Sequence, residues 1–184
     1  IEALFDKGAD KGAIALVTRA ISDGAGTPLA TIRATTFLRG DGGFAAPGTQ
    51  ADGPPKPHPL PERAPDARVT LTTAANQAHI YRLSGDLNPL HIDPDVAAGA
   101  GFRAPILHGL ATYGIVGRAL LAARGGNDPA ALRRMDCRFS SPVYPGETIE
   151  TELWNEADGA TAFRARVVER DVVVLTNGFA EIDG

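Results

Sequence analysis

The fold that we predict for this chain is decided by one stretch, LATYGIVGRALLAAR, which runs from Leu110 to Arg124. This stretch is apolar on nearly every side, with Arg118 the main exception, and a helix of that kind is normally buried. Gly125 and Gly126 are expected to end it. A buried helix followed by an antiparallel meander predicts an α+β fold, a sheet wrapped around a central helix. The strand-like segments that follow the helix are 132–140, 147–155, 161–170 and 172–182.

A proline-rich segment divides the chain upstream of this helix. Residues 41–68 hold seven of the fourteen prolines and few aliphatic residues. Proline fixes φ and removes a backbone donor, and 28 residues are more than an ordinary loop inside one domain needs. We therefore predict three parts, which are a first unit at 1–40, a linker at 41–68 and a second domain at 69–184.

The remaining elements are predicted from local patterns. Residues 13–21 and 29–39 are rich in β-branched residues and predict a hairpin, which must pair with strands from elsewhere because a lone hairpin is marginal in water. Residues 73–83 have helical spacing behind two threonines. Six glycines and prolines between 85 and 105 predict mostly loop, with a short turn or two.

Composition excludes several classes of function. With 184 residues, 43% of them hydrophobic, and a net charge of −4, the chain lacks the basic footprint of a nucleic-acid binder. The longest apolar-rich stretch, 109–123, is too short to span a bilayer, so we expect no membrane insertion. The single cysteine, Cys137, cannot form an internal disulfide, which fits a reducing compartment, and we expect it to be a small core residue.

The remaining histidines and arginines give weaker signals. His79 has no partner at metal-ligand spacing, so we predict no metal site, and His58 is expected to be solvated. A basic strip on one strand face is either solvated or able to meet phosphates; it consists of Arg164, Arg166 and Arg170. The chain starts at Ile1 rather than at Met, so we expect that its true N-terminus is absent.

The densest group of chemically useful side chains is the stretch YRLSGDLNPLHID at 81–93. Asp86 and His91 lie five residues apart, and Pro89 between them forces the chain to turn. A carboxylate and an imidazole aimed at one water can share general acid and base work, and Asn88 could hold that water or a carbonyl. The alternative is ordinary turn chemistry, because Asp and Asn cap their own backbones and proline fixes the bend.

A second feature is PILHG at 105–109, directly before the predicted buried helix. Amides at a helix N-terminus are unsatisfied, and Gly109 has no Cβ to block an approaching oxygen that gains negative charge. The alternative is that Gly109 only permits a tight start of the helix. His108 is expected to be structural or to orient a neighbour.

These motifs resemble a known family. YRLSGDLNPLH at 81–91 is similar to the signature of the type 2 (R-specific) enoyl-CoA hydratases, the MaoC-like dehydratase family of hot-dog folds. The resemblance continues through GFRAPILHGLATYGIVGRALL at 101–121 and FSSPVYPGETI at 139–149. It covers roughly residues 69–182, almost the whole second part.

The resemblance implies a reaction and a set of roles. The family adds water reversibly and syn across the double bond of a trans-2-enoyl-CoA, giving (3R)-3-hydroxyacyl-CoA, with no metal or other cofactor. It implies that Asp86 and His91 form the catalytic pair, that Asn88 positions the water or the thioester, and that the Gly109 amide is the oxyanion donor. The residues expected to contact the CoA or acyl-carrier-protein thioester are Tyr81, Gly85, Pro89 and His108.

The first part resembles the end of the degenerate first repeat in two-domain, double hot-dog members of the family. The residues that carry this resemblance are DKGADKGAIALV and FLRGDGGF. Only about forty residues precede the linker, so residues 1–40 are expected to be a remnant of that repeat. We expect a homodimer or an intrachain pseudo-dimer, in the cytoplasm or, in a eukaryote, the peroxisome. The other functions considered are a non-catalytic acyl-thioester-binding subunit and a hot-dog thioesterase.

Overall fold

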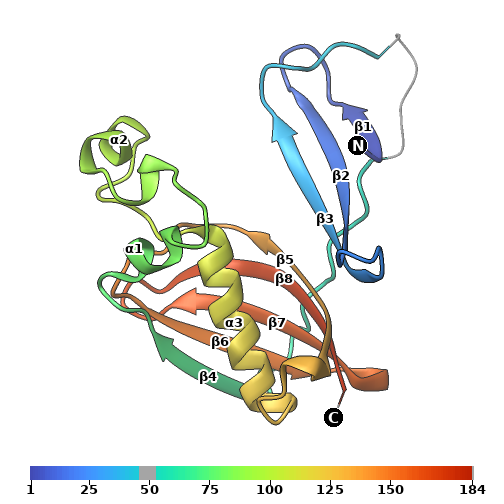
Figure 1. Ribbon diagram of the computed structural model, residues 1–184, viewed down its shortest axis with the longest axis vertical. Helices are drawn as coiled ribbons and strands as arrows, with labels where there is room; N and C mark the ends of the chain where they lie inside the picture. Colours follow the sequence, from blue (N-terminus) through green and yellow to red (C-terminus); the bar gives the residue numbers. More distant parts are fainter. Residues whose placement is uncertain (46–52, 184) are drawn as a thin grey trace. The chain divides into compact units, whose positions relative to one another are not determined.

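The computed structural model describes residues 1–45 and 53–183 and divides the chain into two compact units, Ile1–Lys56 and Pro57–Gly184 (Figure 1). Each unit has its own antiparallel sheet.

The first unit is a three-stranded sheet in the order β1-β2-β3, formed by β1 (Ala3–Asp6), β2 (Ala13–Ser22) and β3 (Pro28–Leu38). The predicted hairpin is confirmed as β2 and β3, and the Asp23 carboxylate in its turn accepts a hydrogen bond from the Thr27 amide at 2.8 Å. The hairpin pairs not with a strand from elsewhere, as predicted, but with β1 in the same unit, a four-residue strand too short to be predicted from its pattern. Nearly all of β3 is exposed.

The second unit is a five-stranded antiparallel sheet in the order β4-β6-β7-β8-β5, with helix α3 (Gly109–Arg124) lying across one face (Figure 1). The predicted α+β fold and its four strands are confirmed. The fifth strand, β4, was not predicted, because its residues lie where proline-rich sequence ends. The strands are β4 (Ala67–Thr72), β5 (Leu132–Phe139), β6 (Thr148–Asn155), β7 (Ala160–Val167) and β8 (Val172–Ile182).

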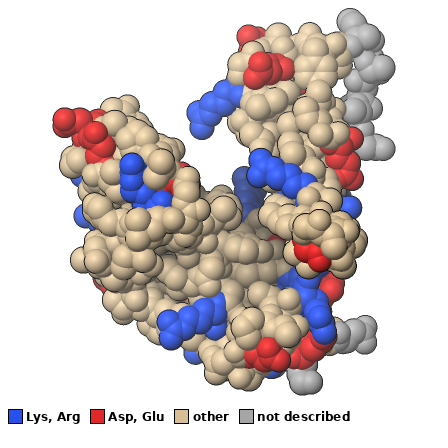
Figure 2. Space-filling model, in the orientation of Figure 1, with Lys and Arg blue, Asp and Glu red and all other residues tan. Residues whose placement is uncertain are grey.

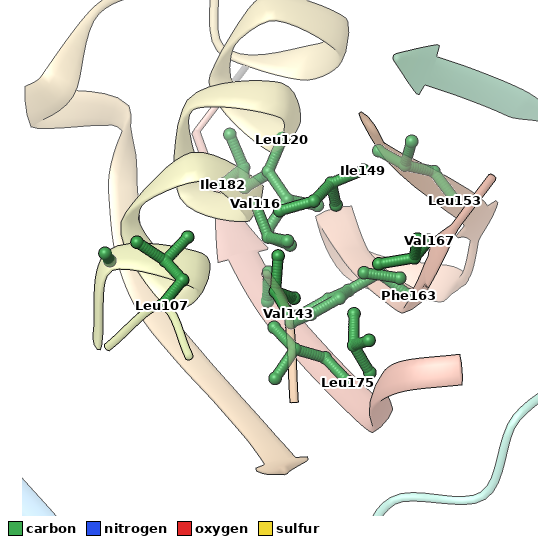
Figure 3. Close-up of a cluster of buried hydrophobic side chains, with 14 of the residues drawn as sticks. Leu107, Val116, Leu120, Val143, Ile149, Leu153, Phe163, Val167, Leu175 and Ile182 are labelled. Carbon is green, nitrogen blue, oxygen red and sulfur yellow. The ribbon is translucent and has the colours of Figure 1, made fainter. Parts of the chain in front are cut away.

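The core lies between α3 and the sheet (Figure 3). Alternate residues of the strands point toward the helix, and Val116 and Leu120 of α3 meet them. The prediction that this helix is buried on all sides is wrong, because the sheet covers only part of the helix. One stripe at four-residue spacing is exposed, namely Leu110, Gly114, Arg118 and Ala122. Other labelled core residues are Leu107, Val143, Ile149, Leu153, Phe163, Val167, Leu175 and Ile182.

The predicted linker differs from the structure at both ends. Residues 43–45 bind the first unit, where the Gly43 and Ala45 amides donate to the Asp6 carboxylate at 2.7 and 2.6 Å. Residues 57–66 belong to the second unit, where Trp154 Nε1 donates to the Arg63 carbonyl at 2.8 Å. His58 is partly buried rather than solvated and contacts Glu156 at 2.9 Å. Residues 46–52 of the predicted linker lie outside the described residues.

Short helices fill the segment before α3, in agreement with the predicted loop with a turn or two. The helix predicted at 73–83 is shorter, because Thr73 bonds the Glu147 carbonyl through both its amide and its hydroxyl. No helix among residues 1–45 and 53–183 is long and apolar enough to cross a membrane. The short helices before α3 are α1 (Gln77–Arg82), the 3-10 turn η1 (Pro89–His91) and α2 (Pro94–Gly99). Two further 3-10 turns, η2 (Pro129–Ala131) and η3 (Ala157–Gly159), follow α3.

The basic strip is paired with carboxylates. Arg164 binds Glu152 and Arg170 binds Glu147, while Arg166 contacts Asp171. Lys and Arg are scattered over the face shown in Figure 2 rather than gathered in one patch. Because these arginines already pair with carboxylates, the strip is better explained as a surface of ion pairs than as a phosphate-binding site. Cys137 packs against the core, and burial raises the pKa of its thiol to about 12.

Candidate active site

The turn between α1 and η1 presents Asp86. Gly85 has a φ of +107°, a conformation that glycine adopts without strain, and this reverses the chain after α1. Asn88 Oδ1 accepts from the Leu90 amide at 3.0 Å and caps η1, where Pro89 occupies the first turn. The turn chemistry considered as an alternative for these residues is therefore present. It does not use the Asp86 carboxylate fully, because among residues 1–45 and 53–183 this carboxylate accepts only one hydrogen bond, a long 3.3 Å contact from the Asn88 amide.

His91 lies in a fixed orientation beneath this turn. It is only 8% exposed, and its Nδ1 is 2.7 Å from the carbonyl oxygen of Ile106. A carbonyl oxygen only accepts, so Nδ1 carries the proton of this bond. In the neutral ring the opposite nitrogen, Nε2, therefore keeps a free lone pair that can accept a proton.

His108 lies directly against His91. The two rings stack with centroids 3.7 Å apart and planes 27° apart, and the Tyr81 ring packs on His108 at 4.8 Å. Nε2 of His108 is 3.3 Å from the backbone carbonyl oxygen of Asp86. Burial, and then the charge of the neighbouring His91, lower the pKa of His108, which favours a neutral ring. At 1% exposure, His108 fits the predicted orienting role better than direct contact with substrate.

Three ionisable groups thus gather at one point. A carboxylate oxygen of Asp86 and one ring nitrogen each of His91 and His108 lie within 4.8 Å of one another. These are residue types that can hold a metal, but the two rings stack face to face rather than pointing their edges at one ion. The group suits proton transfer better than metal binding. That the protein needs no metal stays a prediction.

The N-terminus of α3 follows immediately. The helix starts at Gly109, His108 gives it no side-chain cap, and no acceptor for the Gly109 amide is found among the described residues. A hydrogen-bond donor at the start of a 16-residue helix can stabilise an oxygen that gains negative charge. A Cβ at position 109 would lie 3.2 Å from the ring of Phe139, so glycine leaves room beside this amide.

The structure brings together Asp86, His91 and His108, with Tyr81 behind them and Gly109 next in the chain. Gly85, Asn88 and Pro89 shape the turn that carries Asp86. Two residues of the site were missed by sequence reasoning. Ile106 contributes only a carbonyl oxygen, and Phe139 contributes a ring from β5. Neither residue type signals such a role by itself, although both residues lie in the stretches 101–121 and 139–149 that carry the family resemblance.

Comparison with known proteins agrees with this description. The family described as MaoC like domain matches residues 57–178. The chain is 45% identical over 182 residues to 3-hydroxyacyl-thioester dehydratase Y of Mycobacterium tuberculosis, covering 96% of this chain and 62% of that protein. It is 43% identical over 183 residues to a probable enoyl-CoA hydratase 2 of Dictyostelium discoideum, covering 98% of this chain and 60% of that protein.

Solved structures show the same fold. A crystal structure of a MaoC-like dehydratase from Phytophthora capsici superposes with a TM-score of 0.87 at 40% identity, covering 98% of this chain and 61% of that one. Full-length peroxisomal multifunctional enzyme type 2 of Drosophila melanogaster gives a TM-score of 0.86 at 39% identity, covering 100% of this chain and 32% of that one. The predicted hot-dog fold is confirmed. The chain spans between 29 and 62% of the length of the first curated relatives that it matches.

Proposed function

The chain belongs to the MaoC-like dehydratase family, and on that premise we propose that it hydrates trans-2-enoyl-CoA reversibly to (3R)-3-hydroxyacyl-CoA. The observation that carries the proposal is the placing of the Asp86 carboxylate and His91 at one point, directly before the helix that starts at Gly109. The names of the hydratase and dehydratase relatives support the same class of reaction.

The proposed chemistry needs three contributions from the protein: a group that takes a proton from water, a group that delivers a proton to C2, and a donor that stabilises charge on the thioester oxygen. One O–H bond of water breaks as its oxygen attacks C3, and a proton is delivered to C2 on the same face. Asp86 and the free Nε2 of His91 hold the water and move its proton, a contribution on the order of 100- to 10,000-fold in rate. The Gly109 amide donates to the thioester oxygen, on which negative charge develops.

The remaining assignments are part of the proposal. Tyr81, Gly85 and Pro89 would line the approach to the reacting atoms, and Asn88, whose side-chain oxygen caps η1, has only its amide nitrogen free for water or thioester. Water addition by these groups requires no metal or redox cofactor. The acyl carrier would be CoA or an acyl carrier protein. We propose a homodimer, or a pseudo-dimer within a longer double hot-dog chain, in the cytoplasm or in a peroxisome.

The test is to incubate the folded chain with crotonyl-CoA and with a longer trans-2-enoyl-CoA, following both the absorbance of the conjugated double bond and free thiol. Hydration removes the absorbance and releases no thiol. Thiol release would indicate the thioesterase instead. Binding of the thioester without loss of absorbance would indicate a non-catalytic acyl-thioester-binding subunit, and either of these results would overturn the proposal.

A further inference from the structure

Two histidine contacts cross between the two segments that build the site. His91, from the turn segment, contacts the carbonyl oxygen of Ile106 at 2.7 Å. His108, from the segment before α3, contacts the carbonyl oxygen of Asp86 at 3.3 Å. Each segment therefore supplies one ring and one carbonyl to the other, and the rings stack where the contacts cross. We call this set of four residues the histidine clasp.

We propose that His108 is a positioning residue that, through the histidine clasp, fixes the Asp86 main chain and the ring plane of His91 for proton transfer. This inference rests on the proposed function and extends it to a buried residue, which is 1% exposed. Its consequence is that His91 and His108 hold opposite tautomers. Because both carbonyls only accept, His91 carries its proton on Nδ1 and His108 carries its proton on Nε2.

The choice of histidine at position 108 needs an explanation, since the ring leaves its Nδ1 buried without a hydrogen-bond partner among the described residues. A phenylalanine would supply the stacking face without that unpaired nitrogen, and a glutamine would supply the donor without the face. Histidine combines, in one small ring, a flat face against His91 and a donor to Asp86. The cost of the unpaired nitrogen is therefore offset by two contacts, one to the ring of His91 and one to the main chain of Asp86.

Electrostatics agree with this role. His91 must be able to gain a proton during turnover, and a second charged ring at 3.7 Å would oppose that. Burial and the charge of His91 lower the pKa of His108, so its ring stays neutral beside its neighbour. Arg82, whose Nη1 binds the Leu87 carbonyl at 3.0 Å, adds a positive charge nearby and acts in the same direction.

The first test compares His108→Phe and His108→Gln in the complete chain on crotonyl-CoA. Small misplacements of catalytic groups can cost roughly 100-fold, so we expect His108→Phe to lower kcat roughly 10- to 100-fold while KM changes by less than about 3-fold. His108→Gln keeps a donor toward Asp86 and should recover part of the loss. Unchanged kcat in His108→Phe, or losses in both variants that match only a loss of folded protein, would overturn the inference.

The second test does not depend on activity. Long-range nitrogen–proton NMR spectra of the unsubstituted chain distinguish the two tautomers of each of its four histidines. The histidine clasp requires protonated Nδ1 in His91 and protonated Nε2 in a neutral His108 at neutral pH. The opposite tautomer or a charged His108 would contradict it. If the chain turned over no enoyl thioester, the proposed function would fail, and this measurement would still decide whether the clasp exists.

Discussion

At the scale of single residues, the site divides into an exposed carboxylate and two buried rings. Asp86 is exposed, whereas His91 and His108 are buried. Burial fixes the rings, while the carboxylate is open to solvent. In the proposed mechanism the reacting charge therefore lies on Asp86, whose exposed side chain contributes little to packing and can be changed without disturbing the fold.

Substituting Asp86→Asn removes this charge and preserves the size of the side chain. We expect the chain to stay folded and kcat to fall by roughly 100-fold or more, because a general base is lost. The measurement is the hydration rate of crotonyl-CoA together with the circular dichroism melting curve. Asp95→Asn, an exposed carboxylate in the first turn of α2, is the matched control and should leave the rate unchanged. Equal rates for Asp86→Asn and the control would remove Asp86 from the mechanism.

Substituting Gly109→Ala tests the helix amide. The added methyl group would lie 3.2 Å from the Phe139 ring, which is half exposed and can tilt away, so the fold should persist. The methyl group narrows the approach of an oxygen to the amide. Because loss of one oxyanion donor typically costs roughly 100- to 1,000-fold, we expect kcat to fall by at least about 10-fold.

The control for this change is Gly114→Ala, which lies on the same helix with nothing within 4 Å of its added methyl group. It should keep the full rate of hydration. If both alanine variants hydrate crotonyl-CoA as fast as the unsubstituted chain, the amide of Gly109 plays no part in the reaction.

At this scale the sequence predicted the charged and conformationally special residues, but not their neighbours. Few residue types can transfer protons near neutral pH or leave a backbone amide open to an approaching oxygen, and for this reason the sequence alone singles out Asp86, His91 and Gly109. Ile106 does not, since a backbone carbonyl is common to all residues. The crossed contacts of the histidine clasp depend on how two segments fifteen residues apart meet, which no local pattern encodes.

At the scale of elements, one buried carboxylate ties together the loops around the sheet. Glu147, just before β6, binds Arg170 at 2.6 Å after β7, and Arg103 at 3.3 Å before α3. It also accepts from the Tyr144 amide at 2.8 Å. Burial acts to raise the pKa of Glu147, but the bonds from Arg170 and Tyr144 outweigh it, and the pKa lies below its usual range.

Substituting Glu147→Gln should therefore destabilise the second unit by roughly 3 kcal/mol at neutral pH, because it leaves a partly buried Arg170 without its charge partner. A lowered folded-state pKa means that this stabilisation is present above the ordinary carboxyl pKa and is lost as pH falls through the lowered value. The difference from the unsubstituted chain should thus shrink at acidic pH. Urea unfolding at several pH values measures it.

The exposed carboxylate Glu62 provides the control, and Glu62→Gln should unfold like the unsubstituted chain at each pH. A Glu147→Gln variant whose deficit stayed constant from neutral to acidic pH would show that the ion pair is not its cause.

Elements were predicted well where hydrophobic pattern and length coincide. Helix α3 and strands β5 to β8 are long enough for their pattern to be distinctive. Proline content predicted an extended backbone between 57 and 66, but it could not reveal that Trp154 and Glu156 would bind it. The exposed stripe on α3 was missed for a related reason, since an apolar sequence does not show how much of a helix its sheet can cover.

At the scale of the whole molecule, the two units differ in what they bury. The large buried side chains lie in the second unit, around Phe163 and Leu120, while the first unit buries Ala13 and Ala15 among its described residues. Local stability follows buried apolar contacts. The first unit should therefore open more readily than the second.

Hydrogen exchange followed residue by residue tests this difference. Amides of β2 paired with β3 should exchange roughly 100-fold faster than those of β7, which lies between two strands under α3. Similar protection in both sheets would show that the first unit is stabilised by more than its own core.

The central claim is that this chain adds water to an enoyl thioester on one face only. The most direct test is to let the folded chain act on crotonyl-CoA and to determine the configuration of the hydroxybutyryl-CoA formed. We predict that the enoyl absorbance is lost, that no thiol is released and that the product is the (3R) isomer alone. A (3S) or racemic product, or no product from folded protein, would contradict the claim.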